Sequence, residues 1–97
     1  MKKAYWMVAY RSLSNGAALQ AYGDIAQQVI AVGGGTVLVF SMQPDVKEQG
    51  VQQLTVLVEF PSLAVAHQVY DSEEYKVALS ALGDAAERDF RIVEALA

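Results

Sequence analysis

The sequence predicts an α+β fold in which the elements follow the order strand, helix, strand, strand, helix pair, strand. Three observations lead to this fold. Apolar residues repeat with helical spacing after residue 17, residues 54–60 form a short β-branched run, and a glycine triplet at 33–35 separates a helical pattern from a strand pattern. A chain of 97 residues has the size of one domain, so we expect residues 1–97 to form a single domain.

The first strand and the first helix are predicted from residues 4–30. Residues 4–10 are rich in tyrosine, tryptophan and valine, which favour a strand. The strand is broken at residues 12–16, where Ser14 or Asn15 is expected to cap a helix. The helix begins at Ala17, and its apolar stripe comprises Ala18, Leu19, Tyr22, Ile25, Ala26, Val29 and Ile30, with Gln20, Asp24, Gln27 and Gln28 on the opposite, hydrated face.

The second half of the chain is predicted to hold two strands, two helices and a closing strand. Residues 36–41 and 54–60 are the strands, joined by a polar connection. Each of the helices, residues 63–70 and 73–82, follows a serine that can cap it. Residues 88–96 are expected to close the sheet, and a helix that continues through Ala85-Ala86-Glu87 is the alternative there.

Both faces of the predicted sheet are apolar, which is unusual for an antiparallel sheet with a hydrated side. In the strand of residues 54–60, one face carries Leu54, Val56, Val58 and Phe60, and the other carries Thr55, Leu57 and Glu59. In the strand of residues 36–41, Val37 and Val39 are predicted on one face and Leu38 and Phe40 on the other. Right-handed connections place the helices on one face, so the open face is predicted to pair with a second copy of the chain. An interface of about 800 Å² per partner contributes on the order of 10 kcal/mol before association costs.

The composition of the chain limits the classes of partner that it is expected to bind. Seven basic against eleven acidic residues give a net charge of −4, which argues against nucleic acid as a partner. No stretch is apolar enough to span a membrane, and the chain has no cysteine. We therefore expect a cytoplasmic protein, and a hydrophobic fraction of 54% suggests that apolar surface is covered by a partner or lines a pocket.

Four motifs resemble the DUF1330 family of uncharacterised small bacterial proteins. They are Gly34-Gly35 before a strand, Glu59-Phe60-Pro61-Ser62, Ala66-x-x-x-Tyr70-x-Ser72-x-Glu74-Tyr75 and Ala86-Glu87-Arg88-Asp89-x-x-Ile92-Val93-Glu94. The resemblance implies a ferredoxin-like βαββαβ protomer with helices on one face of a four-stranded antiparallel sheet. It also implies a dimeric α/β barrel, with a pocket between sheet and helices. The chain departs from the family at Thr36 and Leu82, where members often carry arginine.

Two titratable residues are candidates for acid–base catalysis. Glu59 lies in an otherwise apolar strand on the predicted interface, where a dry site would raise the pKa of its carboxyl group. A solvated or ion-paired carboxylate is the alternative. His67 is the single histidine and lies at the edge of a helical apolar stripe. One histidine without cysteine makes a poor metal site, so no metal is expected and a surface histidine is the alternative.

Five aromatic residues are candidates for ligand binding, because a ring with a polar tip suits a flat organic molecule. They are Trp6, Tyr10, Tyr22, Tyr70 and Tyr75. Packing in the core or at the interface is the alternative for each of them. The functional prediction is a homodimer that binds a small apolar organic molecule without metal or cofactor. By analogy with related folds, the prediction includes a metal-independent enzyme of monooxygenase or isomerase type. The alternative is a non-enzymatic structural or regulatory dimer.

Overall fold

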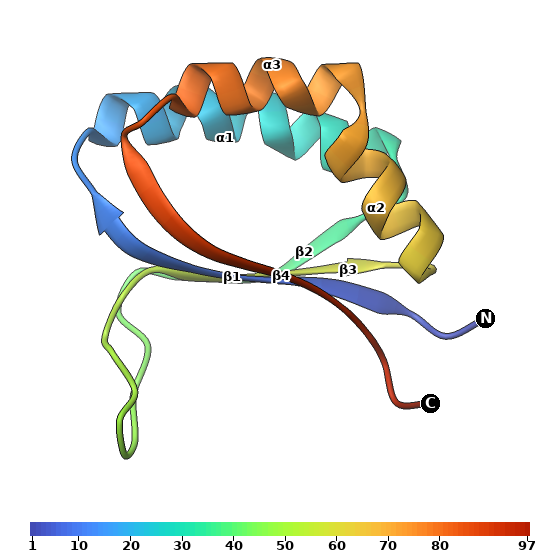
Figure 1. The fold of residues 1–97 in the computed structure, drawn as a ribbon, viewed down its shortest axis with the longest axis horizontal. Helices are drawn as coiled ribbons and strands as arrows, with labels where there is room; N and C mark the ends of the chain where they lie inside the picture. Colours follow the sequence, from blue (N-terminus) through green and yellow to red (C-terminus); the bar gives the residue numbers. More distant parts are fainter.

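The computed structural model describes all residues, 1–97. Its elements in chain order are β1 (Ala4–Leu13), α1 (Gly16–Val32), β2 (Thr36–Ser41), β3 (Thr55–Phe60), α2 (Leu63–Asp71), α3 (Glu73–Leu82) and β4 (Ala86–Glu94). The strands form one antiparallel sheet in the order β2-β3-β1-β4. All helices lie over one side of this sheet (Figure 1). The predicted ferredoxin-like βαββαβ fold is confirmed.

Side-chain caps fix where the helices begin. Asn15 caps α1, because its side chain accepts a hydrogen bond from the backbone N–H of Ala18 at 3.1 Å. Ser14 instead donates its hydroxyl proton to the carbonyl of Ala85 at 3.2 Å and so joins the end of β1 to the start of β4. Ser62 and Ser72 cap α2 and α3 as predicted.

The closing strand β4 begins earlier than the sequence predicts, and the helical alternative at residues 85–87 is wrong. Gly83 ends α3 with a φ of 57°, a left-handed conformation that glycine adopts without strain. Beyond it the chain turns, and Ala86 pairs with Leu13 at the far end of β1. Because β1 extends to Leu13, residues 86 and 87 find pairing partners there and join the sheet.

Strand β2 contains an irregularity that changes which of its side chains face the helices. Val37 pairs with Val58, but the next paired residue is Val39, which lies opposite Leu57. The register shift places Val37 and Phe40 on the helix side and Val39 on the open side. The prediction that Val37 and Val39 share a face is therefore wrong, because strict alternation fails at a bulge.

The core lies between the helices and the sheet and is centred on Trp6, which is 1% exposed. The indole contacts the rings of Phe60, Tyr70, Tyr75 and Phe90 at centroid distances of 4.7, 6.1, 5.1 and 5.1 Å. These tilted and edge-on contacts suit aromatic quadrupoles. The indole N–H donates to the carbonyl of Ala66 at 3.1 Å, so the one polar atom of this side chain is satisfied.

The open face of the sheet is apolar in its middle and charged toward β4. One row across the strands runs Val39, Leu57, Met7 and Arg91. Met7 and Val39 are 47% and 41% exposed, which is high for apolar residues in a sheet. The prediction of an apolar open face therefore holds for the middle row of β1, β2 and β3, whereas Thr36, Ser41, Thr55 and Glu59 make the open side polar toward the strand ends. On β4, Asp89 and Arg91 point outward and form an ion pair.

Candidate functional site

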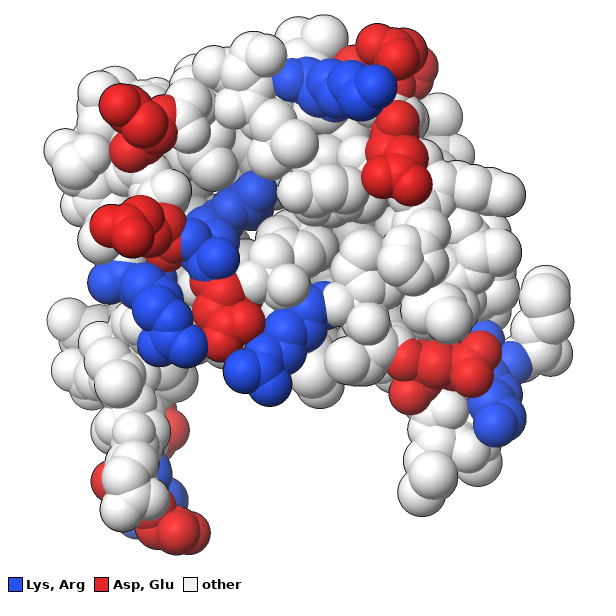
Figure 2. Space-filling view, in the orientation of Figure 1, with Lys and Arg blue, Asp and Glu red and all other residues white.

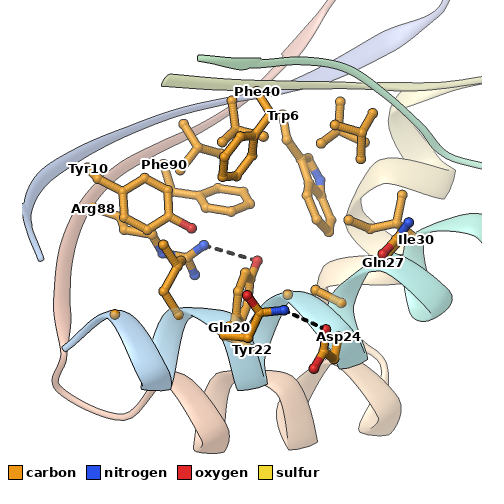
Figure 3. A pocket seen from close by; sticks show the side chains of 18 residues that line it. Trp6, Tyr10, Gln20, Tyr22, Asp24, Gln27, Ile30, Phe40, Arg88 and Phe90 are labelled. Atoms are coloured by element: carbon orange, nitrogen blue, oxygen red, sulfur yellow. Dashed lines mark hydrogen bonds between the residues drawn. The ribbon is translucent and has the colours of Figure 1, made fainter. Parts of the chain in front are cut away.

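A cavity of about 400 Å³ lies between α1 and the helix-facing side of the sheet (Figure 3). Its walls are mostly apolar, and they come from all four strands and from α1. On the sheet side, Trp6, Tyr10, Phe40 and Phe90 project toward the helix. A concave, largely apolar site with a few polar groups is typical of binding sites for small organic molecules.

Glycines on α1 open this cavity. Gly16 and Gly23 both line it and are separated by about two helical turns, so they lie along one line of the helix. Gly23 lies at the centre of the stripe of α1 that faces the sheet, and a Cβ added to it would meet no atom within 4 Å. A larger residue at this position would project into the space. The missing side chain therefore leaves room between α1 and the sheet.

Arg88 supplies the positive charge of the cavity. It lies on β4 opposite Tyr10, on the same face as Phe90, and its side chain points inward. Its guanidinium carbon lies 5.0, 5.6 and 5.1 Å from the ring centroids of Tyr22, Tyr10 and Phe90. Cation–π attraction of this kind partly offsets the cost of withdrawing the charge from water.

Three tyrosines surround the guanidinium group. Arg88 donates a hydrogen bond to the hydroxyl of Tyr22 at 3.1 Å, and this hydroxyl lies 2.6 Å from the hydroxyl of Tyr75. Burial raises the pKa values of Tyr10 and Tyr75, and electrostatic repulsion from the nearby Tyr22 oxygen raises them further. Burial works to lower the pKa of Arg88, but the neighbouring tyrosine oxygens outweigh it and raise this pKa. At neutral pH the guanidinium group of Arg88 is therefore a cation, and the hydroxyl groups of Tyr10 and Tyr75 keep their protons.

The raised tyrosine pKa values predict a loss of stability at alkaline pH. The folded chain holds the protons of Tyr10 and Tyr75 more tightly than the unfolded chain does. Their contribution to stability is thus fully present below about pH 9 and is lost as the pH rises above about 10. Urea denaturation at increasing pH measures this effect, and Tyr75→Phe should reduce the slope. An unchanged slope in that variant would contradict the assignment.

The structure brings three of the five predicted ligand-binding aromatics together at the cavity. Trp6, Tyr10 and Tyr22 line it, from β1 and α1. Tyr75 is fully buried behind Tyr22 and reaches the cavity only through the hydroxyl contact. Tyr70 packs in the core, 5.0 Å from Phe90 and 5.2 Å from Tyr75 between ring centroids, and does not line the cavity.

Neither predicted catalytic residue lies at the cavity. Glu59 is on the open face of the sheet, where it accepts hydrogen bonds from Lys3 at 3.1 Å and from the hydroxyl of Tyr5 at 3.3 Å. This is the ion-paired alternative for Glu59. His67 is exposed on α2, and no group of three possible ligands gathers for a metal. A catalytic role for these two residues stays a prediction, and it would require a site separate from the cavity.

The two positions where family members often carry arginine lie outside the cavity as well. Thr36 pairs with Glu59 at the edge of the sheet, on its open side. Leu82 is 4% exposed in the core at the end of α3. Neither lines the cavity of this chain, whose one cationic lining residue is Arg88.

Arg88 and Gly23 are the residues that sequence reasoning missed. The signal for Arg88 was present in the alternation of β4, since Arg88, Phe90 and Ile92 occupy every second position and share the inward face. Gly23 interrupts a helical stripe of apolar residues, and a glycine inside a helix indicates a packing or functional reason.

Charged side chains on the surface form mixed clusters (Figure 2). In this view the basic groups lie beside acidic groups, and no broad basic patch appears. Asp89, for example, pairs with Arg11 at 2.9 Å and with Arg91 at 3.0 Å. No helix of the chain combines the length and the apolar character that crossing a membrane requires.

Comparisons with known proteins agree with the fold. A family model described as a domain of unknown function (DUF1330) matches residues 3–96. A protein of unknown function from Rhodopseudomonas palustris is 17% identical with a TM-score of 0.70, over 99% of this chain and 84% of that one. A putative antibiotic biosynthesis monooxygenase from Caulobacter crescentus is 20% identical with a TM-score of 0.66, over 99% and 92%.

A further solved structure with a similar fold is that of an oxygenase. SnoaB, a cofactor-independent oxygenase from Streptomyces nogalater, is 8% identical with a TM-score of 0.63, over 100% of this chain and 96% of that one. At these identities the likeness concerns the fold alone. None of the curated proteins compared with the chain matches it.

Proposed function

The chain belongs to the DUF1330 family, and we propose that it binds a small, largely apolar organic molecule in the cavity between α1 and the sheet, as a homodimer. The observation that carries the proposal is the cavity itself. Its volume of about 400 Å³ falls within the range of small-molecule sites, and most of its lining residues are hydrophobic. The space is partly open to solvent, since the lining residues Val37 and Phe40 are 43% and 59% exposed, so a ligand can enter it.

The polar groups that reach the cavity favour binding over proton abstraction. Arg88 and the hydroxyl of Tyr22 are hydrogen-bond donors, and the rings of Trp6 and Phe40 supply flat apolar walls. Such groups orient a ligand and stabilise negative charge on it. The monooxygenase and oxygenase names among the structural neighbours support a chemical step in a cavity of this fold by analogy. Binding is the function that the residues of this chain support directly.

Native mass spectrometry of freshly purified protein tests the proposal together with calorimetric titration of 2-naphthamide, a neutral flat probe. We expect either a retained small molecule or saturable binding of the probe. A protein that retains nothing and does not bind the probe would favour the alternative, a structural or regulatory dimer whose aromatic residues only pack.

Filling the cavity should abolish this binding. Gly23→Leu places an isobutyl group at the centre of the stripe of α1 that faces the sheet, where no atom lies within 4 Å of the new Cβ. We expect at least an about tenfold loss of affinity for the probe, which corresponds to about 1.4 kcal/mol. Removing glycine from a helix interior adds about 0.5–1 kcal/mol of stability, so we expect Gly23→Leu to stay folded, which circular dichroism verifies.

Ala21→Leu is the matched control for Gly23→Leu. Ala21 is exposed on the same helix, outside the cavity lining, so the same side chain there leaves the space free. Affinity for the probe should equal that of the wild type. If Gly23→Leu binds 2-naphthamide as well as Ala21→Leu does, the ligand site lies elsewhere.

The homodimer part of the proposal rests on the open face of the sheet. Residues 42–54 and the C-terminal end both project on the side away from the helices, and the open face lies between them (Figure 1). The space-filling view shows the same two projections flanking a hollow (Figure 2). Exposed Met7 and Val39 form part of the floor. A second copy, related by a twofold axis, would bring like apolar bands together.

A further inference from the structure

The charge of Arg88 has no counter-ion within the chain. Each ion pair of the structure joins other residues, and Arg88 belongs to none of them. Arg11 and Arg91 both pair with Asp89 on the opposite face of the sheet, at 2.9 and 3.0 Å. A partly buried charge without a partner is costly, and natural proteins usually pair such groups. An anion in the cavity would supply the missing partner.

The guanidinium group also has hydrogen-bonding capacity to spare. It carries five N–H donors, and one hydrogen bond, from Nη1 to the hydroxyl of Tyr22 at 3.1 Å, engages it within the chain. The other two guanidinium nitrogens have no hydrogen-bond partner in the chain, and no unpaired side-chain nitrogen of the structure is buried. These two nitrogens are therefore accessible. Because Arg88 lines the cavity, a ligand there can reach them. A fork of such N–H groups matches the two oxygens of a carboxylate.

The hydroxyl of Tyr22 is prepared to donate to the same anion. Tyr75 is fully buried, and its hydroxyl forms its single hydrogen bond with Tyr22, at 2.6 Å. Either hydroxyl can be the donor in this pair, and donation from Tyr75 to the Tyr22 oxygen is the arrangement that gives the buried proton of Tyr75 a partner. That oxygen then accepts from both Tyr75 and Arg88, which occupies its two lone pairs and leaves its own proton free. Figure 3 shows Tyr22 rising from α1 toward Arg88.

The charged groups around the cavity favour one orientation of such a ligand. Asp24 is the acidic residue of the lining; it is exposed on α1 and accepts a hydrogen bond from Gln20 at 3.0 Å. Figure 3 shows Asp24 and Arg88 on different sides of the cavity. An anionic group would thus lie at Arg88, away from Asp24, and the apolar body would extend along Trp6 and Phe40.

We propose that the cavity selects an organic anion, with a carboxylate or a similar oxyanion held by Arg88 and Tyr22 and an apolar, flat body in the remaining space. This proposal rests on the proposed function and gives its ligand class. It makes Arg88 a binding residue and Tyr75 a positioning residue that directs the Tyr22 proton.

Two probes of nearly equal shape, 2-naphthoate and 2-naphthamide, test this proposal by calorimetric titration. They differ in the negative charge, so their ratio of affinities isolates the contribution of the anion site. In the wild type we expect 2-naphthoate to bind about tenfold to a hundredfold more tightly. Arg88→Met should remove that preference and leave the affinity for 2-naphthamide within about threefold. Tyr22→Phe, which keeps the ring, should reduce the preference by a smaller factor.

Lys76→Met is the control, because Lys76 is exposed on α3 and its loss changes the net charge by the same amount. It should leave both affinities unchanged. Equal binding of the two probes to the wild type, or a preference that survives in Arg88→Met, would overturn the anion site and leave small-molecule binding standing. If neither probe binds the wild type, the anion site fails; if native mass spectrometry also finds no retained molecule, the proposed function fails with it.

Discussion

Replacing Trp6 with alanine is expected to lower the free energy of unfolding by about 3–5 kcal/mol, because a large buried side chain leaves both its transfer energy and a cavity behind. Trp6 is 1% exposed and packs against four aromatic rings. Its removal also leaves the carbonyl of Ala66 without its donor. Small domains have little stability in reserve, so we expect a largely unfolded variant near body temperature.

Urea denaturation followed by circular dichroism measures this loss, since the variant has no other tryptophan for fluorescence. Trp6→Phe serves as the control, because it keeps an aromatic ring among the same neighbours and loses the hydrogen bond to Ala66. Its stability should fall between those of the wild type and Trp6→Ala. A loss below about 1 kcal/mol in Trp6→Ala would show that the aromatic cluster is not the centre of the core.

The order of elements could be predicted because it is encoded locally. Asn15 and Ser62 begin helices by hydrogen bonds to backbone groups three residues away, and such capping residues are visible in the sequence. The glycines at 33–35 end α1 for an equally local reason, since few other residues tolerate the φ of 94° found at Gly34. The sheet order then follows from the handedness of the connections.

The candidate site was harder to predict, because it depends on contacts between distant parts of the chain. Arg88 and Tyr22 are separated by 66 positions and meet only after β4 pairs with β1. The bulge at Leu38, which turns Phe40 into the cavity, has no glycine or proline to mark it. Glu59 was a candidate because it is a carboxylate in an apolar strand. Its ion-pair partner, Lys3, lies 56 positions away near the N-terminus, so the sequence does not reveal the pair.

Leu57→Glu is expected to separate the proposed homodimer into single subunits. Leu57 lies on the central strand β3 with Met7 and Val39 on either side, on the open face. In a twofold dimer each copy would bury the new carboxylate without a partner, and such a charge costs several kcal/mol. We therefore expect the dissociation constant to rise by at least about a hundredfold. Leu57 is only partly buried in the single chain, so the fold itself should persist.

Sedimentation velocity over a range of concentrations measures the subunit number, and circular dichroism verifies the fold. Val77→Glu is the matched control, because Val77 is 58% exposed on α3 and lies away from the open face. It should sediment as a dimer, like the wild type. The proposed dimer rests on the exposed apolar surface of the open face, to which Met7 and Val39 contribute. A wild type that remains a single subunit at high concentration would therefore contradict the dimer. A dimeric Leu57→Glu would instead place the contact on another surface.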